Sequence, residues 1–311
     1  MSRNGSSTNG TKKSRGAIVV TGTSTGIGRA TADRLAAAGF HVFAGVRKLE
    51  DAKPGANITP IVLDVTDQST IDAAAATVTK QLGDSPLRGL VNNAGISVAG
   101  PIEFVPLDDF RRQLEVNVIG QVAVTQAFLP LLRKSRGRIV NVGSIGGKMA
   151  SPFLGPYAAS KFALEAITDA LRGELRPWHI AVSIVEPGAI ATPLWERSRV
   201  SATSMLANAP VEATELYGEA IDAMLAAVDV IENRAIPADA VAKAIEHALT
   251  AKRPKTRYLV GIAARAQSIL AGVVPDQAMD GLIAWQLKLP KKGSKAVKKS
   301  APECQPEDSR A

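Results

Sequence analysis

Short runs rich in valine and isoleucine alternate with longer amphipathic stretches from residue 17 onward. Seven such runs occur, at 17–22, 41–46, 58–65, 89–95, 137–144, 181–188 and 257–261, and the amphipathic stretches fall near 27–38, 67–82, 108–134, 155–176 and 237–250. Nearly continuous apolar strands separated by helices are typical of a parallel sheet that is covered on both faces. The alternation therefore predicts an α/β fold, a single doubly wound domain with a seven-stranded parallel sheet.

The same alternation sets the expected domain boundaries. Residues 16–290 are predicted to form one domain, and the polar, basic segments 1–15 and 291–311 are predicted to be a disordered arm and tail. Residues 189–236 interrupt the alternation of strands and helices, between the sixth strand and the next helix. A long insertion at the carboxyl end of a strand lies where such sheets bind ligands, so we expect a substrate lid. The alternative is a surface excursion without a role.

The formal net charge of +8 belongs to the two ends of the chain. Residues 1–16 carry four basic and no acidic residues, residues 288–311 carry seven basic and three acidic ones, and the remainder holds 26 of each. A basic tail can attract acidic lipid or nucleic acid, but such runs are more often only solvated. We therefore expect no nucleic-acid partner, and peripheral membrane contact through the tail is the less favoured interpretation.

The sequence shows no signal peptide, no membrane span and no cluster of metal ligands. The first sixteen residues lack the apolar middle of a signal peptide, and no uninterrupted apolar run has the length of a membrane span, so we expect a cytoplasmic protein. Cys304 is the only cysteine, and His41, His179 and His247 show no ligand spacing. No metal site is predicted.

The segment TGTSTGIG, residues 21–28, follows the first strand and opens a helix. Its glycines let the backbone turn tightly and approach a pyrophosphate, and the helix aims its N-terminal amides at the anion. A loop in this position predicts a Rossmann-type dinucleotide site, although the G-x-x-x-G-x-G spacing departs from the usual G-x-G-x-x-G. The residues predicted to bind the cofactor here are Gly22, Ser24, Thr25, Gly26, Ile27 and Gly28.

The end of the second strand indicates which dinucleotide is bound. NAD binders commonly place an acid there for the ribose 2′-hydroxyl, but this chain has Val46 followed by Arg47. A cation can pair with a 2′-phosphate, with Ser24 adding a hydroxyl and Lys48 as a second candidate cation. NADP(H) is therefore the expected cofactor, and NAD(H) stays the alternative. Arg47 could also be a solvated surface residue without a role in binding.

The pentapeptide YAASK places Tyr157 and Lys161 four residues apart on one face of a predicted helix. A nearby ammonium stabilises a phenolate, so we expect Lys161 to lower the pKa of Tyr157 toward the range that general acid–base catalysis needs. Ser144 ends the fifth strand run, where its hydroxyl can polarise a substrate oxygen. Asn117 lies in an apolar helical stretch and needs a partner if buried. Each residue alone could have a packing or capping role; the four together predict a catalytic site.

These motifs, in this order, resemble the short-chain dehydrogenase/reductase family over about residues 16–260. The matching segments are TGxxxGIG at 21–28, Asp64-Val65, NNAG at 92–95, Asn117, Ser144, YxxxK at 157–161, and Pro187-Gly188 followed by Thr192. In finer detail VFAGVRKLED and the long insertion are similar to the branch that handles hydroxysteroids, retinoids and other lipophilic alcohols.

The resemblance implies an NAD(P)-dependent oxidoreductase acting on CH–OH groups. It implies that Lys161 binds the nicotinamide ribose, that Tyr157 also contacts the cofactor, and that Asn117 holds a water linking Lys161 to solvent. It also implies a homodimer or homotetramer built through the helices at 108–134 and 155–176. The remaining cofactor contacts that it implies are Asp64, Val65, Asn93, Ala94, Gly95, Pro187, Gly188, Ile190 and Thr192.

The residues expected to surround the substrate are mostly apolar, which suits a lipophilic alcohol or carbonyl compound. They are Ile145, Met149, Phe153, Leu194, Trp195 and Met205. A further apolar stripe is expected to pack on the same domain, with a dimer contact or a membrane-surface element as alternatives; it consists of Met279, Leu282, Ile283 and Leu287. Some of these residues can equally serve only the core. Three alternatives stay open: an NAD(H)-dependent enzyme for a small polar or acyl substrate, a non-catalytic dinucleotide-binding regulator, and a sugar-nucleotide epimerase.

Overall fold

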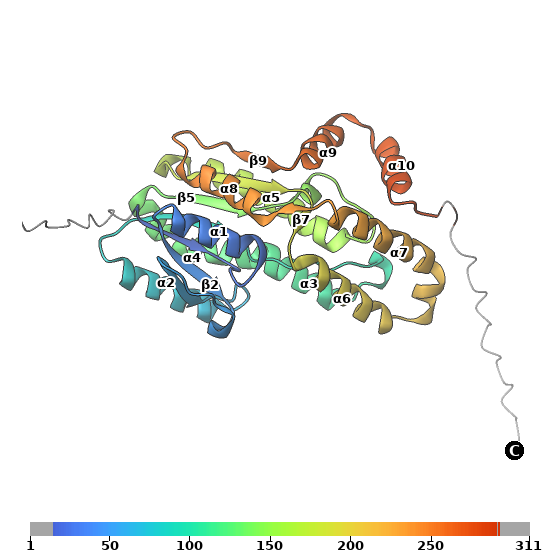
Figure 1. Ribbon diagram of the computed structural model, residues 1–311, viewed down its shortest axis with the longest axis horizontal. Coiled ribbons are helices and arrows are strands. Elements are labelled where there is room, and N and C mark those ends of the chain that lie inside the picture. The colour runs from blue at the N-terminus through green and yellow to red at the C-terminus, as the bar shows by residue number, and fades with distance from the viewer. Residues whose placement is uncertain (1–14, 291, 293–311) are drawn as a thin grey trace, which may run out of the picture.

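A parallel seven-stranded sheet forms the centre of the computed structural model, which describes residues 15–290 and 292 (Figure 1). The strand order is β3-β2-β1-β4-β5-β6-β9. The strands are β1 Ala17–Val20, β2 His41–Val46, β3 Ile58–Val62, β4 Leu87–Asn92, β5 Arg138–Val142, β6 Ala181–Pro187 and β9 Arg257–Val260. The predicted fold class is confirmed, and each of the seven predicted runs supplies one strand.

Helices cover both faces of this sheet. One face carries α1 Gly26–Ala37 and α8 Ala238–Thr250, and the other carries α2 Gln68–Leu82, α4 Gly120–Ser135 and α5 Gly155–Glu174 (Figure 1). The side chains of β1 alternate between the two layers: Ile18 and Val20 pack toward α1 and α8, and Ala17 and Val19 toward α2 and α4. This period of two explains why the strand reads as continuously apolar.

One long helix joins β4 to β5. It consists of α3 Leu107–Leu114, a π-helical turn η3 Glu115–Ile119 and α4. In the described part of the chain, this is the one helix that is long and apolar enough to cross a membrane by length and composition. Its residues Val124, Phe128 and Leu132 are fully buried in the core against the sheet, and 33% of its apolar window is buried in the fold.

The insertion at 189–236 contains two helices whose base is closed by a separate two-stranded sheet. β7 Ile190–Ala191 pairs with β8 Ile236–Pro237, and α6 Leu194–Ala207 and α7 Val211–Glu232 lie between them. In Figure 1 these two helices extend beyond one end of the central sheet.

The last two helices follow β9, and α10 packs back on the insertion. They are α9 Ile262–Val273 and α10 Asp276–Gln286. Met279, Ile283 and Leu287 are buried with Met224 of α7, so the expected stripe does pack on its own domain. Leu282, three residues after Met279, is 38% exposed and does not belong to this buried cluster, so its inclusion among the packed residues was wrong. The predicted basic arm and tail lie outside the described residues, apart from Arg15 and Lys292.

Candidate active site

Tyr157 and Lys161 lie on the first turns of α5, which begins with Gly155 and Pro156. Proline fits the first turn of a helix because its missing N–H would have no partner there. Lys161 is buried; its Nζ donates a hydrogen bond to the carbonyl oxygen of Val142 at 2.9 Å and lies 5.7 Å from the centroid of the Tyr157 ring. The predicted pairing on one helix face is therefore present.

The electrostatics of this pair differ from the expectation. Burial raises the pKa of Tyr157 above its usual value, and hydrogen bonding with the Ser144 hydroxyl acts in the opposite direction. Burial also lowers the pKa of Lys161 from 10.5 to about 8. The prediction that Lys161 lowers the pKa of Tyr157 was wrong for this arrangement, because the loss of hydration dominates and Nζ is directed to Val142.

Ser144 follows β5 and faces the same ring. Its Oγ accepts a hydrogen bond from the N–H of Gly146 at 3.1 Å and so caps the short 3₁₀ turn Ile145–Gly147. A Cβ added to Gly146 would lie 3.3 Å from Cε1 of Tyr157 and 3.4 Å from the Ser144 Oγ. The turn thus brings the serine hydroxyl and the tyrosine ring together across a residue with no side chain.

Asn117 lies in the π-helical turn and is fully buried. Its Oδ1 accepts from the Ile96 N–H at 2.9 Å, and its Nδ2 donates to the Ile96 carbonyl at 3.0 Å and to Ser160 Oγ at 3.1 Å. Ser160 Oγ in turn donates to the carbonyl oxygen of Tyr157 at 2.7 Å. The buried amide therefore ties α5 to the loop after β4, and π-helical turns occur frequently at functional sites.

Sequence reasoning missed two members of this network. Gln113 is fully buried; its Oε1 accepts from the Val98 N–H, and its Nε2 donates to the Ile96 carbonyl at 3.0 Å and to Ser160 Oγ at 3.3 Å. The available signal was spacing, since Gln113 lies four residues before Asn117 on the same helix. Ser160 is the fourth residue of the YAASK motif and could have been included with it.

The phosphate loop has the backbone that its glycines predicted. Gly22 and Gly26 have φ angles of +66° and +58°, which side-chain-bearing residues rarely adopt. A Cβ on Gly28 would lie 2.1 Å from the carbonyl oxygen of Gly22, so only glycine lets α1 approach the loop this closely. The loop residues Ser24, Thr25, Gly26 and Ile27 are partly exposed. These features fit a dinucleotide pyrophosphate at the N-terminus of α1.

The loop after β4 braces the phosphate loop. Asn93 Nδ2 donates to the carbonyl oxygens of Thr21 and Gly22 at 2.9 and 3.1 Å, and the backbone N–H groups of Asn93 and Ala94 both donate to Thr21 Oγ1 at 2.9 Å. A Cβ on Gly95 would lie 3.3 Å from the Asn117 Oδ1. The Asn93 side chain thus has a bracing function beside its predicted cofactor contact.

Two predicted cofactor contacts follow strands β2 and β3. Arg47 is exposed directly after β2 and forms no ion pair with any described residue, whereas Lys48 is 3.5 Å from Glu50. Asp64 Oδ1 accepts from the N–H and the hydroxyl of Thr66, at 3.0 and 2.8 Å. Val65, next to it, is buried. Arg47 is accordingly the freer of the two candidate cations.

The segment after β6 leads from the sheet to the phosphate loop. Pro187 ends β6, and the N–H of Gly188 donates to the Val260 carbonyl at 3.1 Å. Ile190 is buried at the start of β7. A Cβ on Gly26 would lie 3.2 Å from Cγ2 of Thr192, so Thr192 packs directly on the glycine loop.

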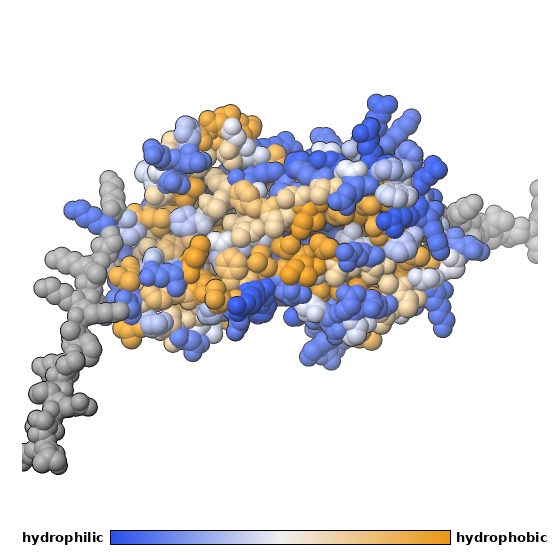
Figure 2. All heavy atoms as spheres, turned by 180° about the vertical axis from the view of Figure 1, so that it is seen from behind, coloured by the Kyte–Doolittle hydropathy of each residue, from blue (hydrophilic) through white to orange (hydrophobic). Residues whose placement is uncertain are grey.

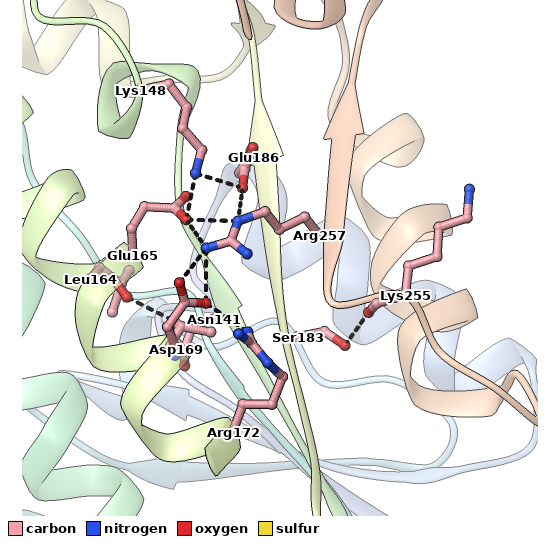
Figure 3. Close-up of polar contacts among 11 residues, drawn as sticks. Asn141, Lys148, Leu164, Glu165, Asp169, Arg172, Ser183, Glu186, Lys255 and Arg257 are labelled. Atoms are coloured by element: carbon pink, nitrogen blue, oxygen red, sulfur yellow. Dashed lines mark hydrogen bonds and ion pairs between the residues drawn. The ribbon is translucent and has the colours of Figure 1, made fainter. Parts of the chain in front are cut away.

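An ionic cluster forms around two buried glutamates, Glu165 and Glu186 (Figure 3). Lys148 Nζ is 2.9 Å from Glu165 Oε2 and 3.8 Å from Glu186 Oε1, and Arg257 is 3.1 Å from Glu165 and 3.4 Å from Glu186. Burial, together with the nearby charge of Glu165, raises the pKa of Glu186 from 4.5 to about 7. The cluster joins four segments: the turn after Ser144, helix α5, the end of β6, and β9.

Two apolar groups lie next to the site. Met149 and Phe153 pack against the cluster around Met224, and Met205 packs against Val98 and Val105. Among residues 15–290 and 292, no group of three or more His, Cys, Asp or Glu side chains could hold a metal ion.

Comparison with known proteins gives consistent matches. The family model described as short chain dehydrogenase matches residues 16–203. The chain is 39% identical over 280 residues to NADPH-dependent 3-dehydrocapnine reductase of Ornithobacterium rhinotracheale, covering 87% of this chain and 96% of the relative. It is 37% identical over 284 residues to retinol dehydrogenase 5 of Mus musculus, covering 88% and 89%. A crystal structure of a short chain dehydrogenase from Burkholderia cenocepacia in complex with NADP has 26% identity and a TM-score of 0.67, covering 89% of this chain and 99% of that one.

Proposed function

Because this chain belongs to the short-chain dehydrogenase family, we propose that it transfers a hydride between NADP(H) and a lipophilic alcohol or carbonyl compound. The observation that carries the proposal is the convergence of Tyr157, Ser144 and Lys161 at the carboxyl end of β5, on the same edge of the sheet as the phosphate loop that follows β1. A dinucleotide-binding regulator would need the loop but not this arrangement of proton-transferring and polarising groups.

The nicotinamide supplies the hydride chemistry, and the side chains handle the proton. Tyr157 donates a proton to the substrate oxygen during reduction and accepts it during oxidation. The hydrogen bond from the Ser144 hydroxyl favours the phenolate of Tyr157 when no substrate is bound, and the same hydroxyl donates its single proton to the substrate oxygen when substrate is present. Lys161, held by the Val142 carbonyl 5.7 Å from the centre of the tyrosine ring, would bind the nicotinamide ribose, as the family resemblance implies. Asn117 holds the start of α5 in place through Ser160.

The preference for NADP(H) rests on Arg47. Its guanidinium is exposed at the end of β2 without a carboxylate partner among the described residues, so it can bind a 2′-phosphate in a charge-assisted manner. Asp64 follows the neighbouring strand, but its Oδ1 is already engaged by Thr66. The NADPH dependence named for the bacterial relative supports this choice.

The substrate class rests on the apolar surroundings of the site. Met149 and Phe153 follow Ser144 in sequence and pack with Met224 of the insertion, which makes the side of the site next to α7 apolar. Such surroundings favour a lipophilic substrate over a charged one. The relative named as a retinol dehydrogenase supports the same class.

Assembly into a homodimer or homotetramer through the two long helices is part of this proposal. Ile119, on the α3–α4 helix, is 54% exposed, and Phe162, on α5, is 44% exposed. Figure 2 shows an apolar area near the centre of the face seen from behind. Apolar side chains gathered on one face are typical of surfaces that bury against another copy.

The test is turnover followed at 340 nm with NADPH and NADH in parallel, across retinoid, steroid, long-chain and small polar carbonyl compounds. The proposal predicts NADPH-dependent reduction of at least one lipophilic compound and little reaction with small polar ones. Turnover confined to small polar or acyl substrates would contradict the substrate class. Binding of NADPH without any turnover would favour the regulator.

A further inference from the structure

Helix α6 is anchored at its first turns by side-chain hydrogen bonds, two of which reach segments far away in sequence. The indole N–H of Trp195 donates to the carbonyl oxygen of Ile190 at 2.7 Å. Arg197 Nη2 donates to Thr25 Oγ1 at 3.1 Å, and Ser198 Oγ donates to Ser97 Oγ at 3.3 Å. One helical turn therefore contacts the phosphate loop after β1 and the loop after β4.

These two loops flank the place where a sheet of this topology binds its ligand. The strand order β3-β2-β1-β4-β5 reverses direction between β1 and β4, and ligands bind outside the carboxyl ends of the strands at this point. Because α6 contacts both loops, it lies across the position that a dinucleotide would occupy. A residue on this helix is thus placed to act on the cofactor rather than only on the substrate.

Arg197 stands out within α6 because its charge is not neutralised. No carboxylate of a described residue forms an ion pair with it, whereas Arg199, two residues later, pairs with Asp229 at 3.0 Å and with Glu232, both on α7. Arg197 instead reaches Thr25, the N-cap residue of α1, whose side chain makes no capping hydrogen bond. A guanidinium beside open helix N-terminal amides is a favourable partner for phosphate oxygens.

We propose that Arg197 is a cofactor-binding residue contributed by the insertion, and that its guanidinium binds the pyrophosphate of the dinucleotide over the phosphate loop. This inference rests on the proposed NADP(H)-dependent function and deepens it. The insertion then closes over the cofactor through α6, with Thr192 packed on Gly26 and Arg197 on the anion. Arg47 and Arg197 bind opposite ends of the adenosine half: the 2′-phosphate and the pyrophosphate.

The two arginines can be separated by ligands that carry only one of these groups. Dissociation constants of NADP⁺ and of adenosine 2′-monophosphate, which lacks the pyrophosphate, are measured by calorimetry on the full chain. Arg197→Gln is expected to weaken NADP⁺ binding roughly tenfold and to leave adenosine 2′-monophosphate unchanged, because one charge-assisted contact is lost. Arg197→Lys should recover part of the loss, since it keeps the charge.

Arg199→Gln is the matched control on the same helix. It removes the ion pairs with Asp229 and Glu232 but not the contact with Thr25, so NADP⁺ binding should stay within about twofold of the wild type. Unchanged NADP⁺ affinity in Arg197→Gln, or equal losses for both ligands, would overturn the role of Arg197. A wild-type chain that binds neither NADP⁺ nor NAD⁺ would instead overturn the proposed function.

Discussion

At the scale of single residues, burial governs the ionisable groups of the site. Lys161 keeps its ammonium inside the protein with one backbone acceptor, and its pKa falls to about 8 as a result. The spacing of Tyr157 and Lys161 could be predicted from the sequence, because i and i+4 residues share a helix face. The direction of the tyrosine pKa could not, since it depends on how much water the folded chain removes from both groups.

The buried lysine makes stability depend on pH in a defined direction. The folded pKa of Lys161 lies below the unfolded value, so the unfolding free energy of the wild type rises as pH increases from about 8 to about 10.5. Lys161→Met lacks this group. Its unfolding free energy relative to the wild type should therefore fall by about 2 kcal/mol between roughly pH 7 and pH 9.5. Urea unfolding at several pH values measures the difference; a constant difference would show that Lys161 keeps an ordinary pKa.

The proposed preference for NADP(H) depends on one residue, Arg47. Arg47→Ala should weaken NADPH binding by about 10- to 100-fold and leave NADH binding nearly unchanged, because only NADPH carries the 2′-phosphate. Titration of both cofactors by fluorescence gives the ratio. Lys48→Ala is the matched control, since Lys48 already pairs with Glu50. Equal losses for NADPH and NADH in Arg47→Ala would remove this account of cofactor choice.

At the scale of elements, the regular helices and strands of the sheet could be predicted, and the irregular pieces could not. The apolar runs and amphipathic stretches gave all seven strands of the sheet and its covering helices, because each is defined by local periodicity. The strands β7 and β8 have two residues each and exist only through their mutual pairing. The π-helical turn at Asn117 and the partners in the loop after β4 likewise depend on contacts between distant segments.

One feature of the sequence indicated the ionic cluster: Glu186 is a charged residue within an otherwise apolar strand. The pKa of Glu186 is raised from 4.5 to about 7 in the folded protein. The free energy of unfolding therefore falls as pH increases from about 4.5 to about 7, because the carboxyl group loses its proton in the folded state. Glu186→Gln should therefore be more stable than the wild type by about 1–3 kcal/mol near pH 8, with little difference near pH 5. Thermal unfolding at both pH values tests this.

Asp169→Asn is the opposite control for the same cluster. Asp169 pairs with Arg257 and Arg172, and its pKa is held below the usual value despite partial burial. Its removal should lower stability near pH 8, where Glu186→Gln raises it. If both variants destabilise the protein near pH 8, the ionised Glu186 side chain does not lower the stability of the wild type.

At the scale of the whole molecule, the domain is built so that its loops meet at one edge of the sheet. The phosphate loop, the loop after β4, the turn after β5 and the segment after β6 all follow the carboxyl ends of parallel strands. Their meeting could be predicted from the fold class. The position of α6 across two of these loops could not, because no periodicity in the insertion specifies where it docks.

The basic tail is expected to be dispensable for the reaction. Deletion of residues 291–311 should leave kcat and KM within about twofold of the wild type, since the residues of the site all precede α9. Steady-state kinetics of the truncated chain decides this. A truncated protein that is folded, as judged by circular dichroism, but inactive would show that the tail contributes to the site.

The most direct test of the central claim is the Tyr157→Phe variant, assayed for hydride transfer at 340 nm and for NADPH binding in parallel. Phenylalanine keeps the ring beside Gly146 and Lys161 but removes the group that exchanges the proton. NADPH affinity should stay within a few-fold of the wild type while turnover falls by at least about 100-fold. Turnover near the wild-type rate in this variant would contradict the assignment of Tyr157 as the acid–base group.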